Sequence, residues 1–146
     1  MRRIILGSMI LMLMLQLAFA VSDRVLQISN GGNFSLEKGE QAILQFNDFT
    51  ERRIILASVE KDAITWKSPE QARPFFKENK QTSSNIGVTH LTIGEEARSH
   101  ETVEMLCIIK LEEVKGSKAV FKVTYYSAPP APKISPWQKV TIQIVR

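Results

Sequence analysis

Apolar and polar positions alternate along most of this chain, and past residue 20 no segment has the 3.6-residue period of a helix. The apolar runs are short, rich in Val, Ile and Phe, and separated by Gly, Pro, Asn or Asp, which is the pattern of strands joined by turns. The runs that predict strands are 24–28, 34–36, 42–46, 54–59, 64–66, 88–93, 102–112, 119–126 and 140–145.

The segment 102–112 has the clearest alternation. Met105, Cys107 and Ile109 belong to one face, and Leu106 and Ile108 make the other face apolar too. A strand with two apolar faces is typical of the middle of a sheet. Two polar stretches interrupt the strands. We expect 67–86 to be a loop with one helical turn near its start, and 94–100 to be a second loop.

Many short strands and no long helix favour an all-β fold made of two packed sheets. Our first choice is an immunoglobulin-like sandwich of seven to eight strands. A closed barrel is the alternative, because alternation alone does not separate the two architectures.

The first 20 residues have a different character. Arg2 and Arg3 precede an almost continuous apolar run, and Ala18-Phe19-Ala20 has the small-x-small form of a signal peptidase site. The run is shorter than the ~20 residues of a spanning helix. The pattern therefore predicts a cleaved signal peptide at 1–20 and one β-sandwich domain at 21–146. The mature protein would be secreted, extracellular or periplasmic, with no membrane segment after cleavage.

Composition narrows the class of protein further. Without Arg2 and Arg3, 17 Lys and Arg stand against 15 Asp and Glu, and the two signs are interspersed. Such a balance gives no basic surface for nucleic acid. The single cysteine, Cys107, permits no internal disulfide, so packing must hold the domain together. Its apolar neighbours indicate a buried structural residue rather than a nucleophile.

Candidate chemistry is sparse. His90 and His100 have no neighbours at metal-ligand spacing, so we expect no metal and no cofactor. The sequence has no Gly-x-Ser-x-Gly turn and no phosphate-binding loop, and its carboxylate pairs are adjacent in sequence, on opposite faces of a strand. We therefore expect no catalytic residues and no enzyme activity. Asn33-Phe34-Ser35 is a glycosylation sequon.

Three connections remain as candidates for recognition, because loops between rigid strands usually carry it. They are 47–53, 94–99 and the proline-rich 125–137, "YYSAPPAPKISPW". If alternate connections emerge at one end of the sandwich, the three form one surface. The prolines and Trp137 suit either a stiff recognition loop with an aromatic anchor or a rigid connector that protects a sheet edge.

The order of these features resembles the chagasin-type inhibitors of papain-like cysteine peptidases. The similar stretches are "FSLEKGEQAILQF" at 34–46, "GEEARSHETVEMLCIIKL" at 94–111, and 116–145, where Pro136-Trp137 precedes the last strand. The resemblance implies a disulfide-free, immunoglobulin-like sandwich that inserts three loops from one end into a peptidase cleft. The partner-binding residues it implies are Asn47, Asp48, Phe49, Thr50, Gly94, Pro136 and Trp137.

The sequence thus predicts a secreted, non-catalytic protein that binds a protein partner and inhibits papain-like cysteine peptidases. The alternative is an adhesin, assembly or structural subunit that uses the same fold through its sheet edges. A third interpretation, a hydrolase with an unrecognised site, has no motif in its favour.

Overall fold

The computed structural model describes residues 23–47, 50–69, 75, 87–102, 105–127 and 139–146. These residues form ten strands, and none of them lies in a helix. The strands are β1 (Arg24–Ser29), β2 (Asn33–Glu37), β3 (Gln41–Asn47), β4 (Thr50–Val59), β5 (Ala63–Lys67), β6 (Val88–Thr92), β7 (Glu96–Thr102), β8 (Met105–Lys115), β9 (Lys118–Ser127) and β10 (Lys139–Val145).

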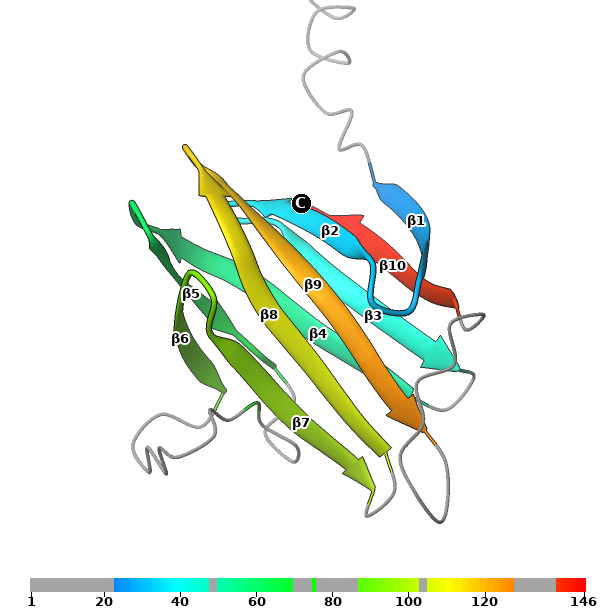
Figure 1. Cartoon of the computed structure of the whole chain (residues 1–146). Helices are drawn as coiled ribbons and strands as arrows, with labels where there is room; N and C mark the ends of the chain where they lie inside the picture. The colour runs from blue at the N-terminus through cyan, green and yellow to red at the C-terminus, as the bar shows by residue number, and fades with distance from the viewer. Residues whose placement is uncertain (1–22, 48–49, 70–74, 76–86, 103–104, 128–138) are drawn as a thin grey trace, which may run out of the picture.

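The strands form two antiparallel sheets packed face to face (Figure 1). The larger sheet has the order β1-β10-β3-β4-β5-β6, and the smaller sheet has the order β2-β9-β8-β7. Each sheet keeps two free edges, so the fold is a sandwich rather than a closed barrel. The all-β, two-sheet prediction is confirmed, but the described strands number ten instead of seven to eight.

Strand β7 accounts for one correction. The polar stretch 94–100 is not a loop, because Glu96–Thr102 pairs in register with β8. Ala97 and Ser99 face the interior and are fully buried, while Glu96 and Arg98 face outward and form an ion pair at 2.6 Å. Because β7 is an edge strand whose inner face buries only these two small residues, its composition resembles that of a loop.

The connectivity also differs from that of an immunoglobulin domain. Strands β3 to β6 stay in one sheet as a meander, and β7 to β9 form a second meander in the other sheet. An immunoglobulin domain instead divides its strands between sheets as ABED and CFG. Here the chain crosses between sheets at β1–β2, β2–β3, β6–β7 and β9–β10.

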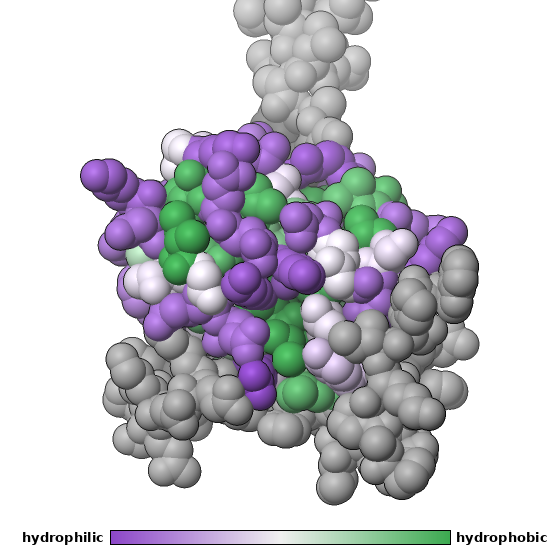
Figure 2. Space-filling model, viewed as in Figure 1, coloured by the Kyte–Doolittle hydropathy of each residue, from purple (hydrophilic) through white to green (hydrophobic). Residues whose placement is uncertain are grey.

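The core lies between the two sheets and follows the period-two pattern of the sequence. Leu36, Leu44, Ile54, Leu111 and Phe121 are all fully buried. Because alternate residues of a strand point to opposite faces, one apolar series per strand is enough to fill the interior. On the outer face of the smaller sheet, hydrophilic positions cover most of the surface, with hydrophobic ones in separate groups between them (Figure 2).

One buried carboxylate ties the two ends of the described chain together. Glu40, in the β2–β3 turn, accepts hydrogen bonds from the Glu37 backbone N–H at 2.8 Å and from Arg24 Nη2 at 3.1 Å. Arg146 Nε lies 3.8 Å from the same carboxylate. Strand β1 and the last residue are thereby anchored to one turn.

The segment predicted to be a signal peptide, 1–20, lies outside the described residues. Within the described ranges, no helix has the length and hydrophobicity to cross a membrane.

Candidate functional site

The two ends of the sandwich differ in their connections. Strands β1, β3, β5, β7 and β9 all finish at one end, which we call the odd-strand end (Figure 1). Strands β2, β4, β6, β8 and β10 finish at the opposite, short-turn end, where every connection is tight: 38–40, 60–62, 93–95 and 116–117. The connections 68–87 and 128–138 both belong to the odd-strand end.

The predicted loop 47–53 is mostly strand, because Thr50 to Arg53 belong to β4 and only 48–49 separate β3 from β4. Asn47 ends β3 and Thr50 begins β4, with a register irregularity between Gln45 and Asn47. Strand β10 pairs with β3 through Thr141 and Gln45, so the residue that follows the 128–138 connection starts beside the end of β3. Asp48, Phe49, Pro136 and Trp137 themselves lie outside the described residues.

Gly94 lies at the opposite end, so the expected three-loop surface does not form. It occupies the β6–β7 turn, with a φ of 90°, and its N–H donates to the Leu111 carbonyl at 2.8 Å. The reason is the unexpected strand β7. This strand reverses the chain once more between Gly94 and the 128–138 connection, so these two connections emerge at opposite ends.

The interior of the odd-strand half is unusually polar and aromatic. Arg52 is 2% exposed on the inner face of β4, and Ser99, Cys107 and Tyr125 are completely buried on the smaller sheet. Arg52, Ser99 and Cys107 each have a further interaction partner. Cys107 is thus confirmed as a buried residue among core side chains. Sequence analysis missed Arg52, although its alternation with Ile54 and Leu56 was a usable signal.

Two aromatic contacts join the sheets. Phe46 of β3 stacks on Tyr125 of β9 with ring centroids 4.4 Å apart. Trp66 of β5 meets Phe121 of β9 edge to face at 5.8 Å. Both contacts link the larger sheet to β9, the strand that leads into 128–138. Such pairs add about 0.5–1.5 kcal/mol beyond the area they bury.

Besides these aromatic contacts, hydrogen bonds from the β1–β2 turn hold the end of β9. Beyond Lys122, β9 no longer has β2 as a partner, and the β1–β2 turn replaces it. The Asn30 amide donates to the Tyr125 carbonyl at 2.6 Å, and its oxygen accepts the Tyr125 N–H at 2.9 Å. Gly31 N–H donates to the Val123 carbonyl at 2.8 Å. The sequence Asn-Gly-Gly indicated a turn but gave no sign of this clamp.

The histidines are not brought together. His90 lies exposed on β6, with Nδ1 3.2 Å from Thr65 Oγ1, and His100 belongs to β7 in the other sheet. Among the described residues, no group of three or more His, Cys, Asp and Glu side chains is arranged to hold a metal ion. The candidate site taken forward below is the odd-strand end of the sandwich.

Comparison with known proteins adds nothing to this geometry. No family model, no curated protein and no solved structure matches the chain.

Proposed function

We propose that this chain is a secreted, non-catalytic binding protein that reversibly inhibits papain-like cysteine peptidases through its odd-strand end. One observation carries the proposal. The register of β10 against β3 places the first residues of β10, which follow 128–138, beside the end of β3, which leads into β4. Connections that leave from neighbouring strand ends can enter a cleft together.

The proposed wedge has two parts. Asn47, Asp48, Phe49 and Thr50 form the first, and Pro136 with Trp137 forms the second. Proline fixes φ and so lowers the conformational entropy lost on binding, while a tryptophan supplies a large anchor. Inhibition would be steric, since no nucleophile is assigned to this end. Gly94, at the opposite end, has no part in the wedge.

Such a wedge also needs a rigid strand to support it, because ordering a flexible loop on binding costs free energy. The Asn30 clamp and the Phe46–Tyr125 stack both act on β9 next to its end. They hold Tyr125 to both the β1–β2 turn and the larger sheet. This support favours the recognition role of the 128–138 connection over the role of a simple connector.

The test is a titration of the purified protein into a papain-like peptidase. We expect stoichiometric inhibition, and Trp137→Ala should raise the inhibition constant about tenfold or more, as for a central aromatic anchor. Gly94→Asn is the matched control, because asparagine tolerates positive φ and this turn is remote from the wedge. Absence of inhibition at high micromolar protein would sink the proposal.

An assembly role through a sheet edge is the second candidate, and strand β6 favours it. This edge strand of the larger sheet, Val88–Thr92, contains no Lys and no Pro, the residues that usually protect an edge from pairing. Sedimentation at increasing concentration tests it. Reversible self-association that His90→Lys abolishes would support edge pairing, whereas a monomer at all concentrations would exclude it.

A further inference from the structure

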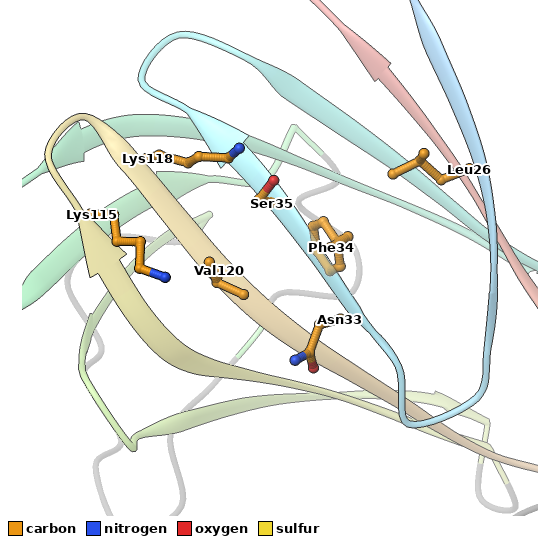
Figure 3. A pocket seen from close by; sticks show the side chains of 7 residues that line it. All are labelled: Leu26, Asn33, Phe34, Ser35, Lys115, Lys118 and Val120. Atoms are coloured by element: carbon orange, nitrogen blue, oxygen red, sulfur yellow. The ribbon is translucent and has the colours of Figure 1, made fainter.

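A groove crosses the outside of the smaller sheet where β2, β9 and the end of β8 meet (Figure 3). Its volume is about 330 Å³. That lies at the lower end of the range of about 300–1,000 Å³ typical of small-molecule sites. The apolar part of its lining comes from Leu26 of β1, Phe34 of β2 and Val120 of β9. The groove is unrelated to the odd-strand end, because Lys115 and Lys118 mark the short-turn end of the sheet.

The apolar floor follows from the strand pairing. Ser35 of β2 lies opposite Val120 of β9 on the outer face, and both side chains are half-buried. Strand β2 is an edge of the smaller sheet and β1 is an edge of the larger one, so Leu26 lies at the side of the sandwich, whereas Phe34 is 3% exposed and belongs to the core behind β2. Val120, half-buried on the outer face, gives a ligand an apolar contact between the lysines of β9.

Lysines surround this floor. Lys118 and Lys122 stand two residues to either side of Val120 on one face of β9, about 7 Å away along the strand. Lys115 closes the groove from the end of β8 and pairs with Glu113 at 2.8 Å. In the part of the chain that the structure describes, neither Lys118 nor Lys122 has an ion pair. Figure 3 shows Lys118 lying across β2 with its ammonium end toward Ser35.

Two acids lie on strands next to this part of β9, and each is paired with another cation: Glu113, opposite Val120, pairs with Lys115, and Glu37 pairs with Arg146. Glu37 lies opposite Lys118 in the β2–β9 register, but its carboxylate accepts a hydrogen bond from Arg146 Nη2 at 2.5 Å. The lining of the groove contains no Asp and no Glu. The polar groups in the lining are two ammonium groups, the Asn33 amide and the Ser35 hydroxyl, all of which can donate hydrogen bonds.

We propose that this groove binds a small amphipathic carboxylate. The apolar body would lie on Val120 and Leu26, and the carboxylate would sit between the Lys118 and Lys115 ammonium groups and accept from the Ser35 hydroxyl. A cation would meet two ammonium groups in the lining, with Glu113, already paired with Lys115, as the acid beside them. A polyanion is disfavoured because Glu112 and Glu113 are on the same strand as Lys115.

The test measures decanoate binding to the purified protein by amide NMR, below the micelle concentration of the ligand. We expect saturable shifts centred on Ser35, Lys118 and Val120. The double variant Lys115→Gln/Lys118→Gln should weaken binding about fivefold or more, since two charge contacts are lost. Lys61→Gln/Lys139→Gln is the control with the same charge change, both lysines being exposed and outside the groove lining, and it should bind as the parent does.

Decyltrimethylammonium separates charge selection from simple apolar adsorption, because it has the same chain and the opposite charge. Weak or absent binding of this cation at the groove is the expected result. The proposal is overturned if decanoate gives no saturable shift, if the cation binds the same residues equally well, or if both double variants weaken binding alike. Spectra of the variants that match the parent elsewhere confirm that the fold is intact.

Discussion

The two ends of this sandwich are built differently. At the short-turn end, connections are tight turns, three of them with a glycine at positive φ, and the interior between the sheets is apolar. At the odd-strand end, the interior contains Arg52, Ser99, Cys107 and Tyr125, and long connections leave the strands. Glu40 is the buried charge of the short-turn end, and it lies in a turn rather than between the sheets.

This difference indicates that the short-turn end mainly stabilises the fold, whereas the odd-strand end has features that stability alone does not require. Apolar packing and tight turns stabilise a sandwich whatever it binds. Buried polar groups cost stability unless they are satisfied, and exceptions to simple packing tend to occur at functional sites. The odd-strand end combines such groups with long connections, which is why our proposal places partner binding there.

The largest effect that tests this comparison is expected at Arg52. Arg52→Ala empties the space of a large side chain that is only 2% exposed and removes the contacts it makes, so it should lower the free energy of unfolding by about 3–5 kcal/mol. Its neighbour Arg53 points outward and pairs with Glu51 at the surface, where such pairs contribute about 0–1 kcal/mol. Urea unfolding of both variants measures the contrast. Equal losses would show that the Arg52 environment is not as described.

A smaller loss of stability is expected when a glycine at each end is replaced by alanine. A Cβ on Gly87 would lie 2.7 Å from the Ser68 carbonyl oxygen at a φ of +88°, whereas a Cβ on Gly94 would meet no atom within 4 Å. Gly87→Ala should therefore cost about 2–3 kcal/mol, and Gly94→Ala only about 1 kcal/mol, from backbone strain alone. Denaturation midpoints of the two variants compare them. The reverse order would contradict the contact at Gly87.

The smallest of the three effects is expected at the Asn30 clamp. Asn30→Ala removes both hydrogen bonds to the Tyr125 backbone and should lower the free energy of unfolding by about 1–2 kcal/mol. Gln45→Ala is the control, because Gln45 is exposed on the outer face of β3 and its loss should stay within about 0.5 kcal/mol. Hydrogen exchange of the Tyr125 amide should accelerate only in the first variant. An unchanged exchange rate of the Tyr125 amide in Asn30→Ala would show that these hydrogen bonds do not hold the end of β9.

The fold class could be predicted from sequence because period-two alternation reports burial directly. Cys107, Ile109 and Leu111 alternate in the printed sequence and are buried as that pattern requires. Strand β7 could not be recognised in this way. Its inner face contributes only Ala97 and Ser99, which are too small to produce an apolar signal.

The candidate site was predictable only in part, because it depends on how many times the chain reverses. Missing one strand was enough to assign Gly94 to the wrong end. The buried Arg52 and the Asn30 clamp depend on partners distant in sequence, such as Tyr125, which lies 95 residues from Asn30. Local patterns contain no information on such pairs.

The most direct test of the central claim blocks one end at a time. Cys107 is completely buried, so a maleimide-polyethylene glycol reagent should react only with an introduced, exposed thiol. Asp48→Cys carries the polymer at the odd-strand end and Ser117→Cys carries it at the short-turn end, and the inhibition constant for a papain-like peptidase is measured for each. The account predicts that the polymer at residue 48 abolishes inhibition and that the polymer at residue 117 leaves it unchanged. Loss of inhibition from residue 117 alone would contradict it.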